Sequence, residues 1–163
     1  MSVDSLKHAG HRPHILITGL PGVGKTTLIR ELAKRLAEYH PAGFYTEEIR
    51  NKQGTREGFR LVTLCGRQLV LSHVNHPGPH RVGRYGVDVA GFERLLAEID
   101  LRHLPSQLIV IDEIGKMECL SRRFTDDVTA LLNQPKVLIA TIALKGEGFI
   151  QRLKGRADCR LVT

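Results

Sequence analysis

The sequence predicts an α/β fold in which a mostly parallel sheet is flanked by helices, and three observations lead to it. Short apolar runs alternate with longer stretches in which apolar residues recur every three or four positions, the pattern of strands followed by helices. Gly and Pro residues separate these segments, as at Pro41 and Pro135. The chain has 163 residues, of which 42% are hydrophobic and 25% charged, so it suits one domain with a closed core.

The first expected elements are a strand, a helix and a second strand. Residues 1–13 are polar and basic, and we expect a flexible leader there, followed by a single domain over 14–163. The apolar residues 15–17 predict a short strand. Residues 26–40 carry apolar side chains at helical spacing and predict a helix, and 43–50 predict the next strand.

The middle of the chain adds a hairpin to this alternation. The short apolar segments 59–64 and 68–72 are separated by Cys-Gly-Arg, which predicts a β-hairpin that extends the sheet in the antiparallel direction. Beyond it, the alternation of helix and strand resumes. These later elements are the helix 89–104, the strand 107–112, the helix 121–133, the strand 136–143, the short helix 149–153 and the last strand 160–163.

Charge and cysteine content narrow the classes of function. The chain has 24 Lys and Arg against 17 Asp and Glu, a net charge of +7 that favours polyanionic partners such as nucleotides or nucleic acid. Aromatic residues are only 5%, which weakens a base-stacking surface for single strands. No apolar run approaches the ~20 residues of a membrane helix. The three cysteines are far apart in the sequence, so we expect no disulfide framework. Because the N-terminus has no apolar segment of a secretory signal, we expect a cytoplasmic protein. We also expect a monomer.

A phosphate-binding motif follows the first expected strand. Residues 19–26 match the Walker A pattern G-x-x-x-x-G-K-[ST] at every fixed position. Such a loop turns backbone N–H groups toward a phosphate, and the next helix presents its N-terminus to the same anion. Lys25 would reach the β- and γ-phosphates, and the Thr26 hydroxyl would ligate Mg²⁺. The expected nucleotide-binding residues are Gly19, Leu20, Pro21, Gly22, Val23, Gly24, Lys25, Thr26 and Thr27.

Two acids stand at the end of the expected apolar strand 107–112: Asp112 is its last residue, and Glu113 follows it directly. In an open parallel sheet, ligands bind beyond the carboxyl ends of the strands, so Asp112 is placed to face a Mg²⁺ ion held by Thr26, as a Walker B acid does. Glu113, one residue further on, would polarise the attacking water as a general base. The alternative for Glu113 is a helix N-cap or a surface acid.

Six stretches of the chain form a wider pattern. They are the phosphate loop, Gly-Phe-Tyr-Thr-Glu-Glu-Ile-Arg at 43–50, Arg-Glu-Gly-Phe at 56–59, Val-Gly-Arg-Tyr-Gly-Val at 82–87, Ile-Asp-Glu-Ile-Gly-Lys-Met-Glu at 111–118 and Ala-Thr-Ile-Ala at 140–143. Together they resemble the small P-loop nucleoside-triphosphate phosphatases of the thermophile and cancer-related type. The resemblance covers residues 14–163, and the second, fourth and fifth stretches are more specific than the phosphate loop.

The resemblance implies a RecA-like P-loop fold of the additional-strand type. It also implies Mg²⁺-dependent hydrolysis of ATP, GTP and other nucleoside triphosphates to the diphosphate and phosphate, with loose base selectivity. Members of this family continue past the last strand with an Asn-Arg pair that helps to hold the base. The chain ends at Thr163, so no base-binding residue is assigned.

Two basic residues are candidates for stabilising the transition state. Lys116 follows Glu113 by three residues, and a cation there would neutralise charge developing on the γ-phosphate. Its alternative role is that of a surface lysine paired with Glu118. Arg84 lies in a glycine-flanked segment that could close over the nucleotide, or it is a solvated loop arginine. Tyr85 beside it would stack on the base or ribose, or serve as a packing anchor.

Weaker candidates remain near the second strand and in a histidine-rich turn. Thr46 and Glu47 could support the Mg²⁺ shell or position water, and solvated acids on an edge strand are the equal alternative. The spacing of His73, His76 and His80 makes a zinc site conceivable, but the neighbouring prolines favour turn chemistry.

The sequence therefore predicts a Mg²⁺-dependent nucleoside-triphosphate phosphatase. Its expected catalytic residues are Glu113, Lys25, Lys116 and Arg84, and its expected metal ligands are Thr26 and Asp112. One alternative is a nucleoside, nucleotide or small-molecule kinase, which shares the phosphate loop but needs an acceptor pocket and a lid that excludes water. The other is a nucleotide-gated module that docks RNA or an acidic protein; nucleic acid is a possible partner that no motif indicates.

Overall fold

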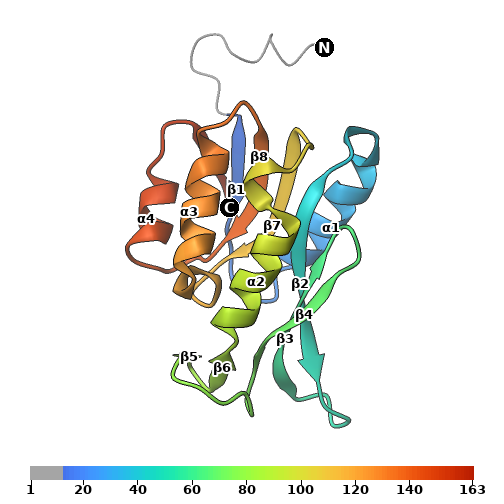
Figure 1. The fold of residues 1–163 in the computed structure, drawn as a ribbon, viewed down its shortest axis with the longest axis vertical. Coiled ribbons are helices and arrows are strands. Elements are labelled where there is room, and N and C mark those ends of the chain that lie inside the picture. Colours follow the sequence, from blue (N-terminus) through green and yellow to red (C-terminus); the bar gives the residue numbers. More distant parts are fainter. Residues whose placement is uncertain (1–12) are drawn as a thin grey trace.

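A nine-stranded sheet forms the centre of the computed structural model, which describes residues 13–163 (Figure 1). The strands are β1 (His14–Ile17), β2 (Ala42–Arg50), β3 (Arg56–Thr63), β4 (Gln68–His73), β5 (Arg81–Val82), β6 (Tyr85–Val87), β7 (Leu108–Ile114), β8 (Val137–Ile142) and β9 (Cys159–Val162). Their order in the sheet is β5-β6-β4-β3-β2-β7-β8-β1-β9. Apart from Pro13, the leader expected at 1–13 lies outside the described residues.

Helices cover both faces of the sheet. They are α1 (Lys25–Arg35), α2 (Val89–Ile99), α3 (Arg122–Leu132) and α4 (Phe149–Lys154), with short 3₁₀ turns η2 (Ala37–Tyr39), η3 (Leu101–His103) and η4 (Glu118–Leu120). Figure 1 looks onto the face covered by α2, α3 and α4, and α1 covers the opposite face. No helix among residues 13–163 is long and apolar enough to cross a bilayer.

The sheet is mixed, which corrects the expectation of a mostly parallel one. The half from β2 through β7, β8 and β1 to β9 is parallel throughout. The half from β2 through β3, β4 and β6 to β5 is antiparallel throughout. The physical reason is the connection between strands: no helix interrupts residues 42–87, and short turns can join only antiparallel neighbours. The two short strands β5 and β6 had no counterpart among the expected elements.

Two of the expected helices end earlier than the apolar spacing suggests. The first ends at Arg35 and continues only as the 3₁₀ turn η2, although apolar spacing runs to Ala37 and the helix was expected to reach residue 40. The second ends at Ile99 because Asp100 adopts a left-handed backbone conformation, with φ of 47°, which turns the chain into η3. Both helix ends are therefore set by backbone turns that the spacing of apolar residues does not report.

The core on the α2, α3 and α4 face centres on three phenylalanines. Phe44 of β2, Phe92 of α2 and Phe124 of α3 are fully buried, and their ring centroids lie 5.4–6.2 Å apart. Such aromatic contacts add to the free energy of burial. The three rings therefore pack α2 and α3 against strand β2.

The parallel half brings the carboxyl ends of four strands together. Strand β8 lies between β1 and β7, with Thr141 opposite Ile17, and β2 pairs with the other side of β7. The pairing of β7 with β8 shifts its register between Ile111 and Ile114, so Asp112 and Glu113 leave the regular ladder there. The phosphate loop, which follows β1, therefore faces these two acids.

Candidate active site

The phosphate loop joins β1 to α1 in the conformation that anion binding needs. Gly24, immediately before the helix, has φ of 99°, a backbone conformation that costs a residue with a side chain considerable strain. No side chain caps α1, so its first N–H groups are available to an anion. The Lys25 ammonium folds back over the loop and donates to the carbonyls of Gly19 and Leu20, each at 3.0 Å.

Asp112 lies at the centre of a cluster of hydroxyl donors. Its Oδ2 accepts from Thr26 Oγ1 at 2.8 Å, from Thr46 Oγ1 at 3.3 Å and from the Thr46 N–H at 3.4 Å. Its Oδ1 accepts from Thr141 Oγ1 at 2.5 Å. The carboxylate is 1% exposed, so these donors replace the water that a buried charge would otherwise lose. Residues from α1, β2 and β8 thus converge on the end of β7.

This arrangement fits a magnesium ion. Mg²⁺ prefers oxygen ligands and keeps several of its waters, so one hydroxyl and one carboxylate from the protein are sufficient beside the substrate phosphates. Thr26 and Asp112 are a hydroxyl and a carboxylate of this kind, and their oxygens lie 2.8 Å apart. Thr18, directly before the loop, is buried, and its hydroxyl has no hydrogen-bond partner among the described residues. A polar group left in this way at the mouth of the loop is consistent with a site built for a polar ligand.

Glu113 lies half-buried beside this cluster. Burial raises the pKa of its carboxyl above the usual value, the charge of Asp112 raises it further, and the nearby Lys25 opposes the shift. A carboxylate with a raised pKa is a better base at neutral pH than an exposed one. The structure therefore brings Glu113, Lys25, Thr26 and Asp112 to the same end of the sheet.

A second acid, Glu118, is buried next to Glu113. It belongs to η4, the turn that follows β7. Burial, followed by the charge of Glu113, raises the pKa of Glu118 to about 8. Its carboxylate accepts from the N–H of Gly115 at 3.2 Å, so the pairing with Lys116 considered from the sequence is not what holds it. Lys116 is exposed, one residue after the glycine.

Arg84 is not brought into contact with the phosphate loop. It lies in the turn between β5 and β6, and the order of the sheet places five strands between β6 and β1. At the usual strand spacing this is about 30 Å along the sheet, far beyond the reach of one side chain. Its guanidinium stacks 5.3 Å from the ring of Tyr85 and donates to the carbonyl of Arg56.

Tyr85 is a packing anchor in this structure. The side chain is 8% exposed, its ring contacts Phe59 edge-on at 5.5 Å, and its hydroxyl accepts from Arg56 Nε at 3.0 Å. Glu47 is also engaged, since it forms an ion pair of 3.4 Å with Arg30 of α1. Of the weaker candidates on β2, only Thr46 contacts the Asp112 carboxylate.

The histidine-rich turn does not gather a metal site. Within residues 13–163, no three His, Cys, Asp or Glu side chains lie close enough to hold a metal ion. His73 instead lies 3.8 Å from Glu57, and its Nδ1 accepts from the N–H of Asn75.

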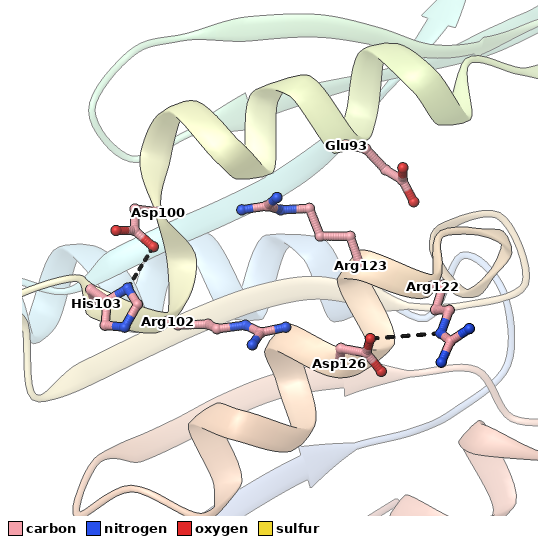
Figure 2. A pocket seen from close by; sticks show the side chains of 7 residues that line it. All are labelled: Glu93, Asp100, Arg102, His103, Arg122, Arg123 and Asp126. Carbon is pink, nitrogen blue, oxygen red and sulfur yellow. Dashed lines mark hydrogen bonds and ion pairs between the residues drawn. The ribbon is translucent and has the colours of Figure 1, made fainter.

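A surface cavity lies away from this site, between α2 and α3 (Figure 2). Its volume is about 490 Å³, and it is lined by Glu93, Asp100, Arg102, His103, Arg122, Arg123 and Asp126. The lining side chains already have partners within the protein: His103 hydrogen-bonds to Asp100 at 2.8 Å, Arg122 pairs with Asp126 at 3.9 Å, and Glu93 accepts from Ser121 Oγ at 2.8 Å. Arg102 donates to the buried Asp127. These ion pairs account for the cavity walls without any ligand.

Thr141 and Glu118 are the site residues that reasoning from the sequence missed. Thr141 stands out as the polar residue in the buried strand 137–142, which is the one pattern that could have identified it. Glu118 follows Gly115 by three residues, the spacing of a capping-box glutamate, which is the local pattern that could have identified it. The Thr141 contact, in contrast, depends on tertiary structure.

Comparison with known proteins agrees with this geometry. A sequence model of the family described as NTPase matches residues 14–163. The nucleoside-triphosphatase THEP1 of Thermotoga sp. (strain RQ2) is 43% identical over 145 residues, which cover 88% of this chain and 82% of that protein. The human cancer-related nucleoside-triphosphatase is 40% identical over 164 residues, covering 91% of this chain and 85% of its own.

Two solved structures have the same fold. The crystal structure of THEP1 from Aquifex aeolicus superposes with a TM-score of 0.78 at 34% identity, covering 91% of this chain and 88% of that one. The solution structure of the human cancer-related nucleoside triphosphatase superposes with a TM-score of 0.74 at 40% identity, covering 91% and 86%. From its sequence and its fold, this chain belongs to the NTPase family.

Proposed function

We propose that this chain is a nucleoside-triphosphatase that hydrolyses the γ-phosphate of ATP, GTP and other nucleoside triphosphates, with Mg²⁺ as cofactor and loose base selectivity. The observation that carries the proposal is the hydrogen bond of 2.8 Å between Thr26, the last residue of the Walker A motif, and Asp112, 86 residues later in the chain. This contact joins the phosphate loop to a buried carboxylate at the carboxyl end of the sheet, where nucleotides bind in open α/β folds.

The strand order supports a RecA-like arrangement of the additional-strand type. In such a fold an extra strand separates the strand before the phosphate loop from the strand that carries the Walker B acid. Here β8 occupies that place between β1 and β7. Its Thr141 hydroxyl bonds to Asp112, so the inserted strand also contributes directly to the proposed site.

The roles of the residues in the phosphate site follow from their chemistry. The loop amides and Lys25 would bind the β- and γ-phosphates, and the three threonine hydroxyls would hold the Asp112 carboxylate in its orientation. Thr26 and Asp112 would hold Mg²⁺ and its waters. The bound ion would offset the charge that builds up on the phosphate oxygens.

Glu113 is the proposed general base. Its carboxylate would accept a proton from the attacking water, directly or through a second water, as that water approaches the γ-phosphorus. The cation that neutralises the charge developing on the γ-phosphate would come from Lys116, which lies in the turn three residues after Glu113. Arg84 could take this role only if the turn between β5 and β6 moves toward the phosphate loop, because β6 and β1 are separated by five strands.

The test is phosphate release from ATP, GTP, CTP and UTP with Mg²⁺ and no added acceptor, comparing the wild type with Glu113→Gln. We expect release from several triphosphates, and a loss of roughly 10²-fold or more in kcat for the variant while nucleotide binding persists. A wild type that binds nucleotide but forms the diphosphate only when an acceptor is added, with the phosphoryl group recovered on that acceptor and not as free phosphate, would support a kinase and refute the hydrolase. Retained turnover in Glu113→Gln would remove Glu113 as the base.

A second candidate function is favoured by the distribution of charge. Residues 48–87, which span the antiparallel half of the sheet, carry seven Lys or Arg against two Glu, and thus +5 of the total charge of +7. A basic extension beside a nucleotide site suits an RNA partner. RNA binding that weakens steeply with salt, and that is lost when the described cations Lys52, Arg60 and Arg81 are replaced by Ser, would support it. Binding unaffected by those changes would refute it.

A further inference from the structure

The carboxyl group of Glu118 is buried without a cation to balance it. Its side chain is 5% exposed. In the described part of the chain it accepts one hydrogen bond, from the N–H of Gly115, and takes part in no ion pair within 4.0 Å. Burying a carboxyl group in this way is costly, and such groups are typically retained where they serve the chemistry of a site.

Gly115 separates Glu118 from the proposed base. A Cβ atom at this position would lie 2.6 Å from Glu113 Oε1 and 2.9 Å from Glu118 Oε2. The backbone here does not have a positive φ, so the glycine is required for space and not for conformation. The absence of a side chain lets both carboxyl groups lie against the same peptide.

The hydrogen bond from Gly115 also fixes the direction of the chain after Glu113. The N–H of Cys119 donates to the carbonyl of Gly115 at 3.0 Å, which closes one helical turn. The Glu118 side chain reaches back to the N–H that opens this turn, as the glutamate of a capping box does. The turn therefore begins two residues after Glu113, and its start is held by a side chain.

We propose that Glu118 is a positioning residue for hydrolysis: by holding Gly115 it fixes the turn behind Glu113 and forms one wall of the space available to the Glu113 carboxylate. The charge of Lys25, on the phosphate loop, acts on the same carboxylate and lowers the pKa of Glu113 against the effect of burial. This inference rests on the proposed role of Glu113 as the base.

Three variants test the inference in the full-length chain. Glu118→Ala removes the wall and the bond to Gly115, and Gly115→Ala places a methyl group between the carboxyl groups. For both we expect kcat with MgATP to fall roughly 10- to 100-fold, with KM and nucleotide affinity within about twofold of the wild type. Glu118→Gln keeps the shape and an oxygen acceptor for Gly115, so we expect it to retain kcat within about threefold.

A double-mutant comparison shows whether Glu118 acts on turnover through Glu113 or independently of it. If Glu118 acts through Glu113, then Glu118→Ala should not slow the residual turnover of Glu113→Gln any further. An equal additional loss would show that Glu118 acts elsewhere and would overturn the inference. If Glu113→Gln itself turns over normally, the proposed function of Glu113 fails first, and that result is distinct from any result on Glu118.

A buried acid elsewhere supplies the control. Asp127 is 1% exposed and bonded to Arg102 on the α2 and α3 face, so Asp127→Asn should lower the melting temperature and leave kcat per folded molecule unchanged. The inference is overturned if Glu118→Ala behaves like this control. It is also overturned if Glu118→Ala acts on KM alone, or if folded Glu118→Gln is as slow as Glu118→Ala.

Discussion

The free energy of unfolding should depend on pH through Glu118, and Glu118→Gln isolates this contribution. Burial raises the pKa of the carboxyl from 4.5 to about 8 in the folded chain. Between these values the folded state holds a proton that the unfolded state has released. The folded state therefore loses stability as the pH rises from about 4.5 to 8.

The size of this effect follows from the shift in pKa. At ~1.4 kcal/mol for each unit, the wild type should lose at most about 5 kcal/mol between pH 4.5 and 8.5 through this one group. The charges facing Glu118 are those of Glu113 and Asp112, and Cys119 beside it has its pKa raised to about 12. Part of the effect is shared with Glu113, whose carboxyl titrates together with that of Glu118. A difference of about 2–5 kcal/mol is therefore expected.

Urea unfolding of both proteins at a series of pH values measures this difference. Any constant cost of placing an amide at the buried position cancels, because only the change with pH is compared. We expect Glu118→Gln to gain stability relative to the wild type steadily from pH 5 to 8.5. If the difference between the two proteins changes by less than about 1 kcal/mol over that range, Glu118 is ionised in the folded state and the reasoning is wrong.

Three further predictions concern the site and the core. Thr141→Val removes the hydroxyl that bonds to Asp112 at 2.5 Å. We expect the free energy of unfolding in urea to fall by about 1–3 kcal/mol, and the Mg²⁺ concentration needed for half-maximal turnover to rise. Unchanged values in both assays would contradict the hydroxyl cluster. Lys25→Met should abolish detectable binding of a fluorescent nucleotide while the circular dichroism spectrum stays that of the wild type, and persistent binding would contradict the placement of the phosphates. Phe124→Ala should cost about 3–5 kcal/mol, measured by urea unfolding, because the ring is fully buried among two others; a cost below 1 kcal/mol would contradict the packing described.

The sequence predicts those elements of the fold that depend on neighbouring residues alone. The strand before the phosphate loop, the helix after it and the apolar strand ending at Asp112 follow from periodicity and from one motif. The antiparallel pairing of β3 with β4 was predicted from the turn between them. The antiparallel pairing of β2 with β3 and the strands β5 and β6 were not predicted, because an amphipathic strand has the same pattern whether its neighbour is parallel or antiparallel. Likewise, the end of α2 at Ile99 depends on the backbone of Asp100, which apolar spacing does not reveal.

The site residues also fall into two groups: those that a sequence motif identifies and those that only the structure identifies. Lys25, Thr26 and Asp112 come from motifs whose spacing encodes chemistry, and the structure places Thr26 in hydrogen-bond contact with Asp112. The bond from Thr141 arises from strand order, and the turn that buries Glu118 arises from packing around Gly115. Arg84 was a candidate because of the glycines that flank it, a local pattern that does not report its place in the sheet, and the fold puts it at the edge far from the phosphate loop.

The position of β1 within the sheet has a consequence for synthesis on the ribosome. Both neighbours of β1, β8 and β9, come from the last thirty residues of the chain, and the ring of His14 bonds to Leu132 and Leu138. The strand β1, which precedes the phosphate loop, is therefore the first strand to be synthesised and the last to gain its neighbours. Its contacts with β8 and β9 join residues far apart in the sequence and have high contact order. Because the phosphate loop begins where β1 ends, we expect nucleotide to bind only after β8 and β9 have paired with β1. A nucleotide-binding assay on nascent chains of increasing length would then record the final step of folding.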